Sequence, residues 1–189
     1  MKTINTTLTT TALFSEDETK RYLLRKVWDS SKPSLAIIML APSEASGIVL
    51  DNTTLLVLNN ASRLGYGSVS IMNLFATLND FSIANAEDED LDNLKVIIDE
   101  VKKCDTLVYA PGVGKAKNAS FQMRSKQILT ELKKYEKKLY CIADKSGLTK
   151  FVHPLTPCVR EWSLLPFSIR EIIGDGEGFE PEEKNAKIK

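Results

Sequence analysis

The chain contains four short apolar runs, each bounded by turn-forming residues. They span residues 34–40, 68–75, 105–110 and 139–143. Continuous apolar runs of this length are typical of strands that are buried on both faces of a parallel sheet. We therefore predict one strand in each run.

Three segments with apolar residues at helical spacing separate these runs. The first helix is predicted over residues 52–64, with Asp51 as its cap and Gly65 at its end. The second follows the acidic stretch 87–90, whose charges suit the first turn of a helix, and the third spans residues 115–136. The residues predicted to face the core are Leu55, Leu58, Ala61 and Leu64 in the first helix, Leu91, Leu94, Ile98 and Val101 in the second, and Phe121, Ile128, Leu132 and Tyr135 in the third.

The two ends of the folded region have less regular patterns. Residues 10–14 are predicted to be extended. Residues 20–28 fit either a helix, with Ser15 and Glu18 as a capping box, or an antiparallel edge strand, which we favour. A segment after the last apolar run is predicted to pack on the body through Trp162, Leu165 and Phe167.

The alternation of strands and helices predicts the fold class. Such an order implies βαβ crossovers and a mostly parallel sheet with helices on both faces. The predicted fold is a three-layer α/β/α domain with a central parallel four-stranded sheet. We expect residues 1–173 to form this single domain. Residues 174–189 are rich in glycine and charge, and we expect them to be disordered.

The composition is that of an ordinary soluble globular protein, with 43% apolar and 26% charged residues in a chain of 189. No apolar run approaches the length of a membrane span, so we predict no membrane partner. Cys104, Cys141 and Cys158 show no Cys-x-x-Cys spacing. We expect reduced thiols, a cytoplasmic location and neither a metal nor another cofactor. The zero net charge disfavours an obligate polyanion binder.

The unusual motifs of the chain all follow a predicted strand. Residues 41–44 follow the first strand, Asn73 ends the second, residues 111–115 follow the third, and His153 comes after the fourth. Ligands of parallel sheets bind at the carboxyl ends of the strands. We therefore expect these four loops to converge on one cleft.

His153 is the only histidine in the chain, and it stands directly before Pro154. An imidazole exchanges protons readily near neutral pH, and the proline biases the backbone before it away from helix. A histidine on a stiff loop suits a site that needs one fixed donor for developing negative charge. A packing or surface histidine is the competing interpretation.

The other motifs also fit structural roles. Asn73 fits a cap at the end of a strand, and Glu44 and Asp51 fit solvated or capping residues. The segment Gly112-Val113-Gly114-Lys115 lacks the spacing of a phosphate loop, so its glycines fit a tight turn between a strand and a helix.

Four motifs, in their order along the chain, resemble those of the uracil-DNA glycosylase superfamily. One of them, Val108-Tyr109-Ala110-Pro111-Gly112 with the following Lys115, resembles a strand and turn that lie between the other motifs. Ala41-Pro42-Ser43-Glu44 is similar to the loop that positions the hydrolytic water. Asn73-Leu74-Phe75 is similar to the strand end whose asparagine binds the uracil edge. His153-Pro154-Leu155 is similar to the loop that supplies the catalytic histidine and a wedge residue. The resemblance implies a glycosylase-like fold, catalysis by His153, base recognition by Asn73 and a wedge at Leu155.

A closer resemblance is to an uncharacterised bacterial and phage family, and it covers roughly residues 12–160. Members of that family carry Met-Leu-Asn-Pro-Ser, Asn-Leu-Phe and His-Pro-Leu motifs. The similar segments in this chain are residues 39–43, 73–75 and 153–155, and residues 21–28 resemble the opening segment of that family.

Ala41 departs from the pattern of these families, which often carry Asp or Asn directly before the proline. Glu44 or Asp51, or the backbone, would then hold the catalytic water. No aromatic residue follows closely after this loop. The base would therefore stack on Phe75 or Phe81.

The function implied by the resemblance is a DNA glycosylase that hydrolyses the N-glycosidic bond of uracil, or of a related base, in DNA. Lys115, Lys150 and Arg160 would contact the DNA phosphates. A monomer is favoured, although the sequence does not determine the oligomeric state. Two alternatives stay open: a catalytically silent DNA- or protein-binding module on the same scaffold, and a hydrolase that acts on free nucleosides or nucleotides.

Overall fold

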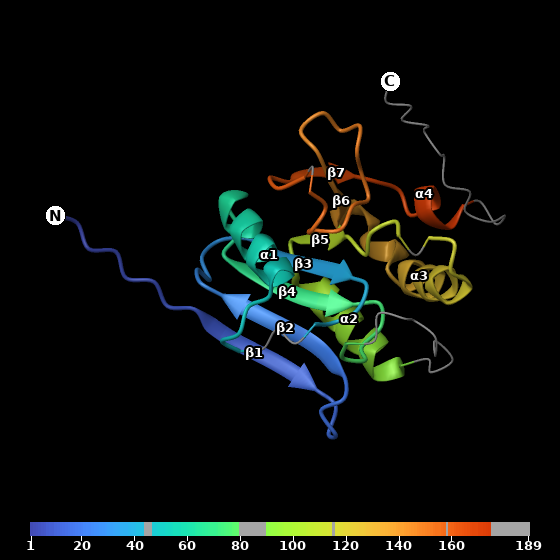
Figure 1. Cartoon of the computed structure of the whole chain (residues 1–189), viewed down its shortest axis with the longest axis horizontal. Helices are drawn as coiled ribbons and strands as arrows, with labels where there is room; N and C mark the ends of the chain where they lie inside the picture. Colours follow the sequence, from blue (N-terminus) through green and yellow to red (C-terminus); the bar gives the residue numbers. More distant parts are fainter. Residues whose placement is uncertain (44–46, 80–89, 115, 158, 175–189) are drawn as a thin grey trace.

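One sheet of seven strands forms the centre of the molecule, in the order β1-β2-β4-β3-β5-β6-β7 (Figure 1). The structure is a computed structural model that describes residues 1–43, 47–79, 90–114, 116–157 and 159–174. The strands are β1 (Thr9–Phe14), β2 (Arg21–Val27), β3 (Ser34–Met39), β4 (Ser68–Asn73), β5 (Thr106–Tyr109), β6 (Leu139–Ala143) and β7 (Ser163–Pro166).

The strands of this sheet run in both directions. β3 pairs in parallel with β4 and β5, and β5 pairs in parallel with β6. β1 and β2 at one edge and β7 at the other edge pair in antiparallel fashion. The predicted α/β class is therefore confirmed, but the sheet has seven strands and not the predicted four. The outermost strands β1 and β7 are only partly buried, and such edge strands need no continuous apolar run.

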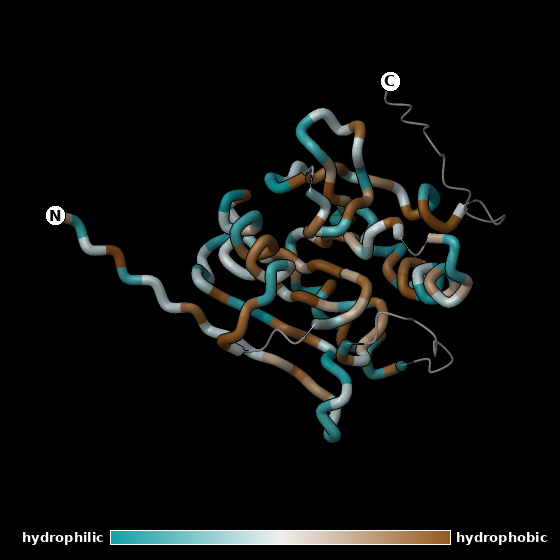
Figure 2. The backbone as a smooth tube through the Cα atoms, viewed as in Figure 1, coloured by the Kyte–Doolittle hydropathy of each residue, from teal (hydrophilic) through white to brown (hydrophobic). Residues whose placement is uncertain are grey.

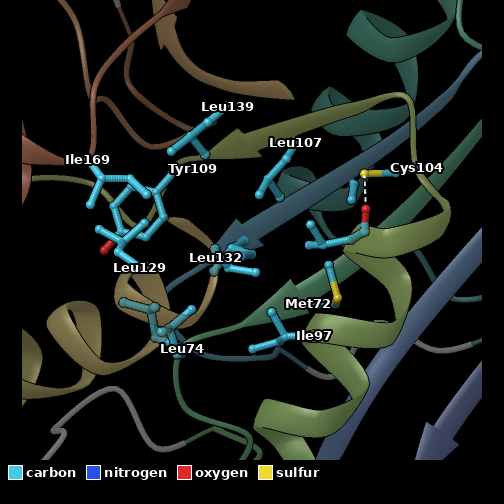
Figure 3. Close-up of a cluster of buried hydrophobic side chains, with 14 of the residues drawn as sticks. Met72, Leu74, Ile97, Cys104, Leu107, Tyr109, Leu129, Leu132, Leu139 and Ile169 are labelled. Atoms are coloured by element: carbon cyan, nitrogen blue, oxygen red, sulfur yellow. Dashed lines mark hydrogen bonds between the residues drawn. The ribbon is translucent and has the colours of Figure 1, made fainter. Parts of the chain in front are cut away.

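Helices cover both faces of the sheet (Figure 1). On one face Val57 of α1 shares an apolar cluster with Ile37. On the other face Ile97 of α2 and Leu129 of α3 share a second cluster with Met72 (Figure 3). Figure 2 shows apolar residues concentrated in the central strands. The helices are α1 (Asn52–Arg63), α2 (Leu91–Lys103), α3 (Ala119–Glu131), the 3-10 helix η1 (Lys133–Lys138) and α4 (Arg170–Ile173).

α1 begins and ends where the sequence predicts, but it is rotated about its axis relative to the prediction. The Asp51 carboxylate accepts a hydrogen bond from the Thr54 amide at 2.6 Å, as a cap does. Leu55, predicted to face the core, is 45% exposed, whereas Asn60 is buried. The Asn60 side chain bonds the backbone of Arg160 and Trp162, and these tertiary bonds decide which face of α1 turns inward.

The other two helices correct the prediction in detail. Leu91, at the start of α2, is 65% exposed because it lies in the first turn beyond the edge of the cluster. The single helix predicted over residues 115–136 is divided into α3 and η1. α3 begins after Asn118, whose side chain accepts from the Phe121 amide at 3.0 Å and caps the helix.

β2 confirms the strand that we favoured for residues 20–28, but this strand does not lie at the edge. It lies between β1 and β4. Its pairing with β1 contains a bulge, because Leu13 is opposite Leu23 whereas Phe14 is opposite Arg21. Tyr22 is the extra residue. Such a bulge interrupts the alternation of side chains between the two faces of the strand, and here it changes the face of Arg21, which directly precedes Tyr22.

Candidate active site

The carboxyl ends of β3 and β5 form the topological switch point of the sheet. The chain leaves β3 through α1 towards β4 on one side and leaves β5 through α3 towards β6 on the other. A crevice opens where neighbouring connections diverge in this way. It holds a cavity of about 590 Å³, which we call the cleft. Its lining residues include Arg21, Met39, Ala41, Ser43, Asp51, Gly112, Val113, His153, Leu155 and Thr156.

His153 reaches the cleft from a turn after β6. The Leu155 amide donates to His153 Nδ1 at 3.2 Å, and the Thr156 amide donates to the His153 carbonyl at 2.9 Å. Because Nδ1 accepts a hydrogen bond, the neutral ring carries its proton on Nε2. Burial lowers the pKa of His153, and the charge of Asp51 opposes this only in part. The site therefore presents a neutral imidazole with an Nε2–H donor.

Gly112, on the loop after β5, lies directly against His153. A Cβ atom on Gly112 would come 3.1 Å from the His153 Cβ. The Gly112 φ angle is +82°, a left-handed conformation that glycine adopts without steric cost. This glycine therefore serves both the turn and the close approach of the histidine loop.

Asp51 caps α1 and also borders the cleft. Its carboxylate accepts from the Thr54 amide and from the Ser43 hydroxyl. Burial raises the pKa of Asp51, but these hydrogen bonds and the charge of Arg21 outweigh burial, so the pKa lies below its usual value. The cleft thus holds an ionised carboxylate at neutral pH.

Arg21 is the cleft residue that sequence reasoning missed. It is 2% exposed, and its Nη1 donates to the Ser43 carbonyl at 3.1 Å. β2 contains two further cations, Arg25 and Lys26, so an arginine at its start gave no distinct signal. Strand periodicity also does not reveal the bulge at Tyr22 that turns Arg21 towards the cleft.

Asn73 lies beside the cleft and not in its wall. It pairs with Met39, a lining residue, in parallel register. It lies two residues after Ile71 of the α1-side cluster, so its side chain is on that face. Asn73 is 1% exposed, and neither its amide nitrogen nor its amide oxygen has a hydrogen-bond partner among the described residues.

Residues 21–155 match the family described as protein of unknown function (DUF1643). The chain belongs to this family. The DUF1643 match begins at Arg21 and ends at Leu155, two residues of the cleft wall, so it includes every lining residue except Thr156. No curated protein and no solved structure matches the chain.

Four residues predicted for the site of this DUF1643 protein lie elsewhere among the described residues. Phe75 packs against the cluster on the α2 side of the sheet. Pro42 is buried, and its carbonyl accepts from Asn79. Lys150 forms an ion pair with Glu171, and Arg160 lines a separate hollow.

Glu44, Phe81 and Lys115 are outside the described residues. In the part of the chain that is described, no group of three or more His, Cys, Asp and Glu side chains could hold a metal ion. Within the same part, no helix has the length and apolar character to cross a membrane.

Proposed function

We propose that this DUF1643 protein is a cytoplasmic DNA glycosylase that hydrolyses the N-glycosidic bond of uracil, or of a related base, in DNA. The observation that carries the proposal is the state of His153. A neutral ring with its proton on Nε2 is a fixed donor for the negative charge that builds on the departing base. The parallel pairings of β4, β3, β5 and β6 agree with a glycosylase-like scaffold.

Asn73 is the proposed reader of the base. A buried amide without hydrogen bonds costs about 1–3 kcal/mol, and such a group in a native fold calls for an explanation. Both polar atoms of Asn73 are in this condition among the described residues. Uracil O4 and N3–H would satisfy the amide nitrogen and oxygen together, whereas cytosine presents the opposite pattern.

Asp51 is the proposed acceptor of the proton from water. The water oxygen forms a bond to C1′ of the sugar while the C1′–N bond breaks and its electron pair leaves with the base. His153 Nε2–H donates a hydrogen bond to the resulting base anion, and Asp51 takes the proton that the water loses. The low pKa of Asp51 keeps the carboxylate in its accepting form, and Asp51 thereby fills the role that Ala41 leaves open.

Leu155 is the proposed wedge. It is 40% exposed and lines the cleft beside His153. A base that leaves the DNA stack costs a few kcal/mol. An apolar side chain that fills the vacated space offsets part of this cost.

One observation favours a second candidate, a hydrolase of free nucleosides. Lys150 is engaged with Glu171 at 2.8 Å, and Arg160 lies in a separate hollow with Asp144 and Glu161. Neither cation lines the cleft, although phosphate contacts normally position a protein on DNA. A free nucleoside needs no such contacts.

The deciding experiment compares two substrates in parallel. Purified protein is incubated with uracil-containing single- and double-stranded oligonucleotides and with deoxyuridine, and released uracil is measured by chromatography, with His153→Ala as the control for a contaminating enzyme. Release from the oligonucleotides supports the glycosylase. Release from deoxyuridine alone supports the nucleoside hydrolase, and release from neither leaves a silent binding module.

A further inference from the structure

Arg21 is a buried cation at the first position of β2. Its side chain is 2% exposed. Leu23 and Leu24 lie in the clusters on opposite faces of the sheet, as successive strand residues do. The bulge at Tyr22 interrupts this alternation, and Arg21 borders the cleft on the α1 side. Burying a cation is costly unless it is paired and hydrogen-bonded, so the groups that bind Arg21 at the cleft account for its position.

A continuous chain of hydrogen bonds joins Arg21 to the start of α1. Arg21 Nη1 donates to the carbonyl of Ser43. The hydroxyl of the same Ser43 donates to the Asp51 carboxylate, whose other oxygen accepts from the Thr54 amide. One residue of the loop after β3 therefore carries the connection from β2 to Asp51.

The charge of Arg21 also acts on Asp51. Burial lowers the pKa of Arg21 to about 10, and Asp51 opposes that shift, so Arg21 stays protonated at neutral pH. Arg21 from β2 and His153 from the loop after β6 both interact with the charge of the Asp51 carboxylate. Since His153 is neutral at this pH, Arg21 supplies the positive charge.

We infer that Arg21 is a positioning residue that fixes the Ser43–Asp51 pair at the wall of the cleft. It holds Ser43 through the carbonyl and Asp51 through its charge. The consequence for catalysis rests on the proposed function, but the effect on Asp51 does not. Lys26 of the same strand contacts this loop at a second point, because its ammonium group donates to the Gly47 carbonyl at 2.8 Å.

The test is an NMR titration of the Asp51 carboxyl carbon, assigned with Asp51→Asn. Arg21→Gln keeps a donor for Ser43 but removes the charge, and Arg21→Lys keeps the charge. Arg25→Gln is the matched control, since Arg25 lies on the same strand and faces Glu100 at 3.6 Å. We expect Asp51 to titrate at higher pH in Arg21→Gln, and as in the wild type in the other two variants. Unchanged titration in a folded Arg21→Gln overturns the inference.

A double-mutant cycle covers the case in which Arg21→Gln does not fold. The cycle compares the thermal unfolding of Arg21→Gln, Asp51→Asn and the double variant. If the two residues form one unit, Asp51→Asn costs less stability in the Arg21→Gln background than in the wild type, or recovers the folded signal. Additive losses, or a double variant that is no more folded than Arg21→Gln, overturn the inference.

Activity measurements separate this inference from the proposed function. In an active protein, loss of positioning in Arg21→Gln should slow uracil release by about a hundredfold, and the acid limb of the pH profile should move to higher pH. If the wild type is inactive but the Asp51 titration depends on Arg21, the glycosylase proposal is wrong and the positioning role stands. If the wild type is active but the Asp51 titration is unchanged in Arg21→Gln, the positioning role is wrong and the glycosylase proposal stands.

Discussion

Gly112 and His153 are in such close contact that a Cβ atom on the glycine would lie 3.1 Å from the Cβ of the histidine. The two residues belong to loops about 40 positions apart in the chain. Their contact joins the loop after β5 to the loop after β6, and it sets how far the imidazole extends into the cleft. Any side chain at Gly112 must move the histidine or the loop that carries it.

Gly112→Ala should therefore destabilise the protein and disturb the site. Its φ of +82° alone costs an alanine about 1–2 kcal/mol, and contact with His153 adds to this. Gly65→Ala is the matched control, because Gly65 has a φ of +88° and open space around its Cβ position. Denaturant unfolding should show a larger loss for Gly112→Ala. Equal losses in the two variants contradict the close contact.

His153→Ala should slow uracil excision by two to three orders of magnitude, because loss of one donor to a developing anion costs about 3–4 kcal/mol. Affinity for DNA, measured by fluorescence anisotropy at fixed salt, should change little because phosphate contacts do not involve the imidazole. If His153→Ala excises uracil as fast as the wild type, the histidine has a structural role and not a catalytic one.

Two substitutions at Asp51 separate its capping role from its chemical role. Asn is as good a helix cap as Asp, so Asp51→Asn should keep the cap and lose the charge that accepts the water proton. Asp51→Ala should lose both, and losing the cap should cost about 1 kcal/mol more than losing the charge alone. We expect both variants to lose excision, and Asp51→Ala to be the less stable of the two in urea unfolding. An active Asp51→Asn rules out the carboxylate as the proton acceptor.

Asn73 and Asn93 form a matched pair of buried amides with opposite expected effects. Asn73 makes no side-chain hydrogen bond to the described residues, so Asn73→Ala should change the free energy of unfolding little while it abolishes excision. Asn93 donates to the carbonyls of Asn73 and Leu74 at 3.1 and 3.2 Å. Asn93→Ala should cost about 1–3 kcal/mol, because the buried Asn73 carbonyl loses this donor, although the Leu74 carbonyl still accepts from Arg124 Nε at 2.9 Å.

If Asn73→Ala proves the more destabilising of the two, its amide has a structural partner and is not reserved for a base. Asn73→Asp provides the functional counterpart. An active variant should discriminate less between uracil and cytosine in competition assays with the two bases in the same sequence context.

The free energy of unfolding should fall as the pH is lowered from about 7 to 5. Burial lowers the pKa of His153 in the folded state below the unfolded value of about 6.5. The unfolded state therefore binds more protons in this range, and stability decreases as pH falls below the unfolded pKa. The lowered pKa of Asp51 acts in the same direction, but only below about pH 4. His153→Gln should flatten the pH dependence, measured by urea unfolding. Parallel curves for both proteins contradict a partly buried His153 that is neutral in the folded state.

Much of the fold and part of the site follow from the sequence alone, because they depend on residues that are close together in the chain. The apolar runs predicted β3, β4, β5 and β6 within two residues at each end. Asp51 was recognised as a cap from its place before a helical pattern, and the structure confirms the bond to Thr54. The order of strands and helices was enough to place Ala41, Ser43 and His153 at one edge of the sheet, where they line one cleft.

Helical spacing correctly predicted that Ala61, Val101 and Ile128 face the core, but tertiary structure alone decided the faces of other side chains. The bulge at Tyr22 turns Arg21 into the cleft, and a bulge arises from pairing with another strand, not from local periodicity. Phe75 was expected near the base but packs on the opposite face. Asn60, not Leu55, faces inward on α1 because its amide bonds a segment one hundred residues away. Such contacts join distant parts of the chain, so only the folded arrangement determines them.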